Sequence, residues 1–248
     1  MGWIEPLRVE ENRCTSSESL PATETTYPGA RKTMIPKYRH AAVVIDVFRA
    51  FTTACHVLEA VPLEYLMTNK CKVVARLGVS RPSALLIGKP EVGNQSKYDI
   101  PNSPTLAAQS LVRGRNVIHR SNAGAKGLLQ ASTHDACLAV CFSNLSASAR
   151  WLSLHAERFE VFPMGHEGEY PSAEDDLCRD ALLAKIKEEP FCMIGVKERL
   201  KAGPGRYFFG PENAEYPRAD FERCLEVDAV NFPIRAIPCG DYVRIERG

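Results

Sequence analysis

Residues 43–54 read VVIDVFRAFTTA. The first five are apolar and β-branched apart from Asp46, a pattern typical of a buried strand in a parallel sheet. Arg49, Thr52 and Thr53 follow, in what should be the first turns of a helix. Ligands of open α/β sheets bind where strands give way to helices, and the N–H groups of a helix amino terminus favour anions. The stretch therefore predicts an α/β sheet with a ligand site beside Asp46.

A simpler interpretation is that Asp46 caps the helix and Arg49 pairs with it on the surface. A carboxylate, a guanidinium and two hydroxyls gathered at one junction favour a site instead. The reason is that a buried aspartate needs a partner or a metal to be tolerated.

Length and composition narrow the class of protein. The chain has 248 residues, 45% of them hydrophobic, with a net charge of +1 and nine cysteines. Near-neutral charge argues against nucleic acid and anionic membranes as partners, and no apolar run approaches the length of a membrane-spanning helix. An odd number of cysteines without paired spacing is typical of free thiols in a reducing compartment, so we expect a cytoplasmic protein.

Two regions differ in pattern. Residues 1–36 are expected to be a loop-rich amino-terminal arm, because Ser, Thr, Glu and Pro dominate much of that segment. Residues 37–248 are expected to form one α/β domain, with a division into two subdomains near 110–116 left open. This region alternates strand and helix, which predicts a three-layer α/β fold: a mostly parallel β-sheet flanked by helices on both faces. The expected strands are 43–47, 84–87, 116–120, 136–142 and 160–164, and the expected helices are 49–60, 106–112, 124–131, 145–156 and 172–188.

Polar clusters recur after the later strands as well. Each one alone could be a turn or a helix cap. Together they would lie on one edge of one sheet, where basic groups and acids suit a phosphorylated substrate with Mg²⁺. The candidates beyond the first cluster are Asn102 and Ser103; Arg120, Ser121, Asn122 and Lys126; Ser143 and Asn144; and Glu174 and Asp175.

Cysteines and histidines carry less weight. The thiols in apolar strands and helices, Cys178 among them, are expected to be core residues. His119 lies inside a strand and is expected to be buried there. His166 follows a strand and is the histidine that we would test as a proton donor.

These motifs together resemble the 2-phosphosulfolactate phosphatase family. The resemblance runs from about residue 41 to residue 245 in family order. It is carried by the motifs Val43 to Thr53, Pro101-Asn102-Ser103-Pro104, Arg120 to Gly127, Cys141 to Ala147, Glu174-Asp175-Asp176-Leu177-Cys178, Arg206-Tyr-Phe-Phe and Asp220-Phe-x-x-Cys224-Leu.

The chain also departs from the family pattern. Gly88-Lys89-Pro90 stands where members usually carry Gly-Glu-Arg, and Glu91 lies two residues after the expected glutamate. Pro101 replaces a glycine, which restricts the backbone. In the third motif, Ala125 replaces a threonine and Lys126 a glutamine.

The resemblance implies hydrolysis of 2-phosphosulfolactate to 3-sulfolactate and phosphate, with Mg²⁺, as in coenzyme M biosynthesis. Asp46, Arg49 and Arg120 would be catalytic. Asp46, Glu174 and Asp175 would hold the Mg²⁺, and the arginines would neutralise the anionic groups of the substrate. The substrate would be bound by Thr52, Thr53, Asn102, Ser103, Ser121, Asn122, Lys126, Ser143 and Asn144.

Two alternatives stay open. The departures favour either a phosphatase of the same fold acting on a different phosphorylated carboxylate, or a non-catalytic relative that binds a metabolite. The expected partner is in every case a small phosphorylated acid, and a homodimer is favoured only because many such enzymes are oligomeric.

Overall fold

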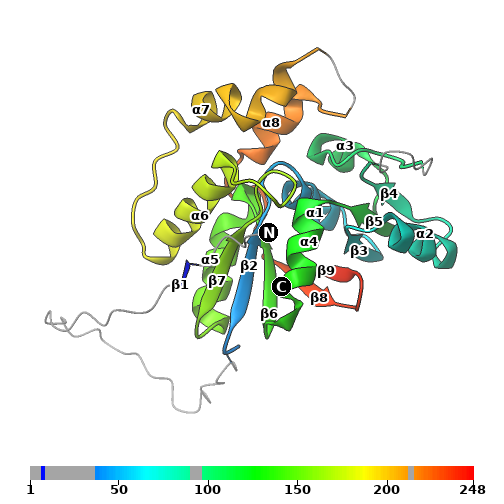
Figure 1. Ribbon diagram of the computed structural model, residues 1–248, viewed down its shortest axis with the longest axis horizontal. Coiled ribbons are helices and arrows are strands. Elements are labelled where there is room, and N and C mark those ends of the chain that lie inside the picture. The colour runs from blue at the N-terminus through cyan, green and yellow to red at the C-terminus, as the bar shows by residue number, and fades with distance from the viewer. Residues whose placement is uncertain (1–6, 9–36, 90–96, 212–214) are drawn as a thin grey trace, which may run out of the picture.

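The computed structural model describes residues 7–8, 37–89, 97–211 and 215–248. The described strands form one nine-stranded sheet in the order β1-β7-β2-β6-β8-β9-β3-β5-β4 (Figure 1). Its strands are β1 (Leu7–Arg8), β2 (Ala41–Ile45), β3 (Glu64–Thr68), β4 (Leu85–Ile87), β5 (Asn116–Arg120), β6 (Ala136–Val140), β7 (Phe159–Pro163), β8 (Ile234–Pro238) and β9 (Val243–Arg247).

The sheet has two parallel wings joined by an antiparallel hairpin. In one wing β2 pairs in parallel with β6 and β7, and in the other β5 pairs in parallel with β3 and β4. The hairpin β8–β9 lies between them, antiparallel to β6 and to β3. The predicted mostly parallel sheet is confirmed, and the hairpin is an addition that the sequence patterns did not predict.

Helices cover both faces, which confirms the three-layer α/β fold. α4 contacts β2 and β6 and lies in front of the strands in Figure 1, while α5 and α6 pack against each other. The helices are α1 (Ala50–Glu59), α2 (Cys71–Ser80), α3 (Pro104–Gln109), α4 (Ala123–Gln130), α5 (Leu145–His155), α6 (Ala173–Ile186), α7 (Val196–Ala202) and α8 (Arg218–Cys224), with 3-10 turns η1 (Ala131–Thr133), η2 (Phe142–Asn144) and η3 (Pro204–Phe209).

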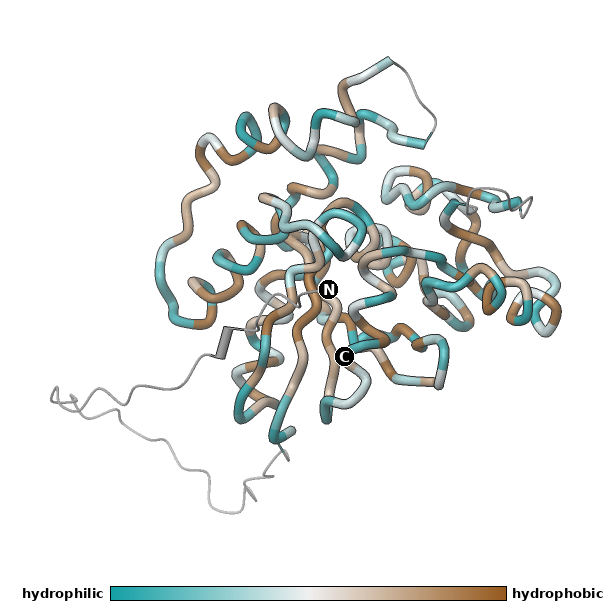
Figure 2. The backbone as a smooth tube through the Cα atoms, in the orientation of Figure 1, coloured by the Kyte–Doolittle hydropathy of each residue, from teal (hydrophilic) through white to brown (hydrophobic). Residues whose placement is uncertain are grey.

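The core forms along the central strands. All five residues of β2 are fully buried, as expected for a strand covered on both faces. The central strands are accordingly brown in Figure 2, while the helices alternate brown and teal turns. Cys178 and His119 are buried there too, as the sequence predicted. The division near 110–116, which the sequence left open, falls between α3 and β5, and β5 belongs to the same sheet as β2.

All ten predicted elements exist, with bounds that match or differ by at most three residues. β2 begins at Ala41 and ends at Ile45, so Asp46 lies just beyond the strand and not inside it. The elements β3, α2, α7, α8, β8 and β9 were not predicted. Within the predicted arm 1–36, only Leu7–Arg8 is described, as a short strand paired with β7. None of the helices in the described part is both long and apolar enough to cross a membrane.

Candidate active site

A pocket of about 530 Å³ lies at the carboxyl ends of the parallel strands. The loops that follow β2, β4, β5 and β7 line it, as the topology predicts for an open α/β sheet. The amino terminus of α6 and the segment around η3 complete the wall. α7 and α8 lie above this edge of the sheet in Figure 1.

Asp46 follows β2 and is buried in the pocket wall. Its Oδ1 accepts a hydrogen bond from the N–H of Ala50 at 3.0 Å, so the carboxylate does cap α1. The backbone of Gly124 donates to the same carboxylate. Burial nevertheless raises the pKa of Asp46 to about 6, against the opposing effect of these amides and of Arg49. Asp46 therefore both accepts a hydrogen bond from the start of α1 and lines the pocket.

Glu174 and Asp175 lie beside Asp46 at the start of α6. Burial raises the pKa of Glu174 to about 7, and the charges of Asp46 and Asp176 add to the shift. Burial, followed by the charges of Asp46 and Glu174, raises the pKa of Asp175 well above its usual range. The charge of Asp46 thus disfavours the ionisation of both neighbouring acids, and the charge of Glu174 disfavours that of Asp175.

The two acids of α6 differ in their hydrogen bonds. Asp175 Oδ1 accepts from the N–H of Val47 at 2.8 Å, and Oδ2 accepts from the N–H of Gly165 at 2.8 Å. Asp175 thereby ties the loop after β2 to the loop after β7. Glu174 Oε2 is buried with no hydrogen-bond partner among the described residues. Such an atom is costly to bury unless a ligand satisfies it.

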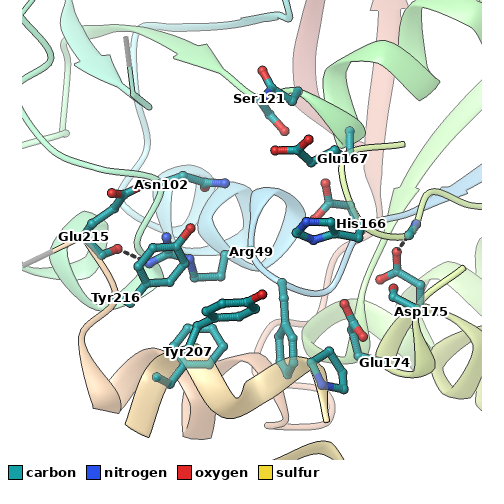
Figure 3. Close-up of a pocket in the computed structure, with 18 of the residues that line it drawn as sticks. Arg49, Asn102, Ser121, His166, Glu167, Glu174, Asp175, Tyr207, Glu215 and Tyr216 are labelled. Atoms are coloured by element: carbon teal, nitrogen blue, oxygen red, sulfur yellow. Dashed lines mark hydrogen bonds between the residues drawn. The ribbon is translucent and has the colours of Figure 1, made fainter. Parts of the chain in front are cut away.

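Arg49 lies on the other side of the pocket, together with Tyr216, as Figure 3 shows. Its Nη1 donates to the carbonyl of Glu215 at 2.6 Å and to Asp220 Oδ2 at 2.8 Å. The guanidinium also lies 4.4 Å from the centre of the Tyr216 ring. Its ion-pair partner is Asp220 rather than Asp46, and the pair is buried, so the simpler interpretation of a surface pair with Asp46 is wrong. The hydrogen bonds described for Arg49 both come from Nη1, which leaves the Nε and Nη2 edge for a ligand.

Two further cations reach the same pocket. Arg120 ends β5, is buried, and donates from Nη1 to the carbonyl of Lys89 at 2.9 Å. Lys89 is exposed, and its Nζ lies 3.4 Å from Glu215 Oε1. Lys89 stands where the resemblance predicts the glutamate of Gly-Glu-Arg, so this position brings a positive charge. Pro90 and Glu91 lie outside the described residues.

Eight of the residues predicted for the site line the pocket. They come from four separate segments of the chain, which the fold brings together as the sequence analysis expected. They are Asp46, Arg49, Asn102, Arg120, Ser121, Asn122, Glu174 and Asp175.

The other predicted residues do not line it. Thr52 donates to the carbonyl of Val47, Ser103 donates to Asp220, and Lys126 Nζ lies 3.5 Å from the carbonyl of Gly168. Asn144 caps the turn after β6 through the N–H of Cys141. The remaining two, Thr53 and Ser143, are fully buried.

The pocket also contains residues that the sequence patterns did not identify. Arg206, Tyr207 and Phe208 of η3 and the following Tyr216 form its aromatic and basic wall. Only the match of Arg206-Tyr-Phe-Phe to the family ending could have drawn attention to them. His166, which the sequence suggested as a proton donor, does line the pocket and points toward its interior in Figure 3.

The acid cluster fits a divalent cation. Asp46, Glu174 and Asp175 offer only oxygen atoms, the ligands that Mg²⁺ prefers. A cation beside them would offset the cost of burying ionised carboxylates, which is the main reason that their pKa values are raised, and it would give Glu174 Oε2 a partner.

Comparison with known proteins agrees with this geometry. The family model described as 2-phosphosulpholactate phosphatase matches residues 29–201. A probable 2-phosphosulfolactate phosphatase of Caldanaerobacter subterraneus is 26% identical over 147 residues, which are 58% of this chain and 61% of that protein. The one of Bacillus subtilis is 23% identical over 83% of this chain and 90% of its own length. The one of Deinococcus radiodurans is 30% identical over 53% of this chain and 55% of its own length. The chain belongs to the 2-phosphosulpholactate phosphatase family, a family of hydrolases that act on phosphoric monoesters.

Proposed function

We propose that this protein is a Mg²⁺-dependent phosphatase that hydrolyses the phosphate monoester of a small organic acid. The reaction would be of the type in which 2-phosphosulfolactate and water give 3-sulfolactate and phosphate, as in coenzyme M biosynthesis. One observation carries the proposal: a single pocket combines three buried acids with the cations Arg49, Lys89 and Arg120.

Substrate binding would depend on the cations. A phosphorylated sulfonated acid carries phosphate, carboxylate and sulfonate groups, so it needs several positive partners in one site. The open guanidinium edge of Arg49 suits a two-oxygen contact with one such group, and Arg120 and Lys89 offset the remaining charge. Asn102, Ser121 and Asn122 supply hydrogen-bond donors and acceptors that orient the acid.

Mg²⁺ would be held by Asp46 and Glu174, and Asp175 would supply a third ligand oxygen. Asp175 also connects the loops after β2 and β7 through its hydrogen bonds to Val47 and Gly165. When bound by the three acids, Mg²⁺ would supply Lewis-acid stabilisation of the phosphoryl oxygens. Arg49 and Arg120 would stabilise the charge that shifts toward the leaving oxygen. His166 would give a proton to that oxygen as the bond to phosphorus breaks, while water supplies the new P–O bond.

Phosphate release by the purified protein tests this function. The substrates should be 2-phosphosulfolactate, phospholactate, phosphoglycerates and phosphoenolpyruvate, each with Mg²⁺ and with EDTA. We expect release from at least one of them, dependent on Mg²⁺. No release from any of them by folded protein would reject the proposal and favour the non-catalytic alternative.

A different phosphorylated carboxylate as substrate is favoured by one observation. Lys89 puts a positive charge into the pocket where the resemblance predicts a glutamate. The same panel separates the two cases, because the preferred substrate is then a compound other than 2-phosphosulfolactate.

The eight described cysteines are all free, which supports the proposal of a reducing, cytoplasmic environment.

A further inference from the structure

Two imidazoles converge on one carboxylate at the end of the sheet opposite the pocket. His40 immediately precedes β2, His134 lies two residues before the start of β6, and Glu160 is the second residue of β7. His40 Nε2 lies 3.2 Å from Glu160 Oε1, and His134 Nε2 lies 3.6 Å from Glu160 Oε2. The pocket follows the carboxyl ends of the same strands, so this cluster is separate from it.

The hydrogen bond of His134 fixes which ring nitrogen carries the proton. His134 Nδ1 lies 3.2 Å from the carbonyl oxygen of Ala131. A carbonyl only accepts hydrogen bonds, so Nδ1 is the protonated nitrogen. In the neutral ring, Nε2 then presents a lone pair to the carboxylate oxygen of Glu160. Two lone pairs facing each other repel, so the contact favours a cation between them, either a proton on Nε2 or a metal ion.

A proton on each ring is a poor solution, because the two rings are neighbours. The centres of the His40 and His134 rings are 4.7 Å apart, and two imidazolium ions at that separation repel each other. A metal ion is bound by neutral imidazole and satisfies both rings and the carboxylate at once. A ring whose other nitrogen donates to a backbone carbonyl is the usual arrangement of a metal-ligating histidine.

The spacing suits a small transition-metal ion. Bonds of about 2.0–2.2 Å in a tetrahedral site separate neighbouring ligand atoms by about 3.3 Å. The two nitrogen–oxygen distances, 3.2 and 3.6 Å, bracket that value. One ligand atom from each of the three residues lies within 4.8 Å of the others. The three side chains are half-buried, between 13% and 30% exposed, so an ion can reach them from solvent.

The backbone holds the three ligands in place. β2 pairs with β6 on one side and with β7 on the other, and Ala42 stands opposite Glu160. The N–H of His40 donates to Asp135 Oδ2 at 3.0 Å, and the N–H of Asp135 donates to the carbonyl of His40 at 3.0 Å. The segment before β2 is therefore tied to the segment before β6.

We propose that His40, His134 and Glu160 bind a divalent transition-metal ion, for which Zn²⁺ is the probe of choice, as a structural clamp across β6, β2 and β7. Two imidazoles and one carboxylate select such an ion over Mg²⁺, which prefers oxygen ligands only. This site does not depend on the phosphatase activity, because it lies at the other end of the sheet and uses different ligands.

Calorimetric titration with Zn²⁺ tests the proposal, with excess Mg²⁺ present to occupy oxygen-only sites. We expect one Zn²⁺ site in the wild type that weakens at least tenfold in His134→Asn and in Glu160→Gln. Glu157→Gln, a substitution of an exposed glutamate three residues before Glu160, is the matched control and should bind as the wild type does. Because the exposed thiol of Cys192, present in every variant, can also bind Zn²⁺, the diagnostic result is the weakening that is specific to the His134 and Glu160 variants.

A measurement on the wild type avoids any folding defect of the variants. Zn²⁺ should shift the ring NMR signals of two of the six histidines, and His134→Asn and His40→Asn should assign them. The melting temperature should rise with Zn²⁺ in the wild type and in Glu157→Gln only. Absence of a histidine shift, or equal Zn²⁺ affinity in Glu160→Gln and the wild type, would overturn the proposal.

Discussion

Arg49 and Asp220 form a buried ion pair, 2.8 Å from Nη1 to Oδ2, between positions 171 residues apart in the chain. The other oxygen of Asp220 accepts from Ser103 Oγ at 2.9 Å and from the N–H of Thr105 at 3.0 Å. The carboxylate of Asp220, in α8, therefore binds both Arg49 and the start of α3. Asp220 is a positioning residue that sets where Arg49 can meet a ligand.

Asp220→Asn should weaken both stability and substrate affinity. The asparagine side chain carries no negative charge to pair with Arg49. Its NH₂ group would also face either Arg49 or the N–H of Thr105, which are themselves hydrogen-bond donors. Breaking one member of a buried pair costs about 3–5 kcal/mol, and we expect a loss near the lower end because the amide keeps one acceptor. Denaturant unfolding measures the stability, and a rise in KM larger than the fall in kcat would identify the positioning role.

The control for Asp220 is Glu222→Gln on the same helix. Glu222 pairs with Lys197 on the surface, where an exposed pair contributes at most about 1 kcal/mol. Equal losses of stability in the two variants would contradict the account of Asp220.

Glu174→Gln should stabilise the protein at alkaline pH while it impairs the site. The pKa of Glu174 is about 7 in the folded protein against an ordinary value of 4.5, so the folded state holds the proton more tightly. Ionisation therefore costs folded stability as the pH rises from about 4.5 to 7, and below 4.5 the effect is absent. With EDTA present, we expect the variant to gain about 1–3 kcal/mol at pH 8 and nothing at pH 4.

Thermal unfolding at the two pH values measures this gain. Glu157→Gln serves again as the control, with no gain at either pH. Mg²⁺ should raise the melting temperature of the wild type at pH 8 more than that of Glu174→Gln, because a ligand stabilises the state that binds it. A variant that is less stable than the wild type at pH 8 would show that ionisation of Glu174 does not destabilise the folded protein.

Gly124→Ala should displace the Asp46 carboxylate. A Cβ at Gly124 would lie 2.8 Å from Asp46 Oδ2 and 2.9 Å from the Phe51 ring. Overpacking of this kind costs about 1–3 kcal/mol, and a shift of the carboxylate should lower kcat at least about tenfold. Gly78→Ala in α2 is the control: nothing lies within 4 Å of its Cβ, so we expect unchanged kcat and a gain of about 0.5–1 kcal/mol. Unchanged kcat in Gly124→Ala would mean that Asp46 tolerates the displacement.

The sequence predicted those parts of the fold that have a strong local pattern. β2 is a run of buried apolar residues, and β5 was predicted with its observed bounds, Asn116–Arg120. β3 has the sequence EYLMT, which has no β-branched run and begins with a polar residue, and it was not predicted. β9, with the sequence VRIER, alternates apolar and polar residues, and that alternation is a signal that could have been used.

The site was predictable as far as strand ends determine it. Asp46 and Asn122 follow strands, Arg120 ends one, and the parallel wings bring these strand ends to one edge. Asp220 and Tyr216 come from the end of the chain, and nothing local marks a residue there as the neighbour of Arg49. Their contribution depends on how α8 and η3 pack over the sheet, which is a long-range property. Ser103 and Asn144 show the converse: their patterns were recognised, and the structure gives them hydrogen bonds within turns and helix starts.

The rate of phosphate release by Asp46→Asn, beside the wild type at saturating Mg²⁺, tests the central claim most directly. An asparagine keeps an oxygen that can accept from the N–H of Ala50, so the fold should persist, as circular dichroism can verify. The account predicts that the variant loses at least about 100-fold in kcat, since a charged group at the reacting centre is removed. A folded Asp46→Asn protein that releases phosphate at the wild-type rate would contradict it.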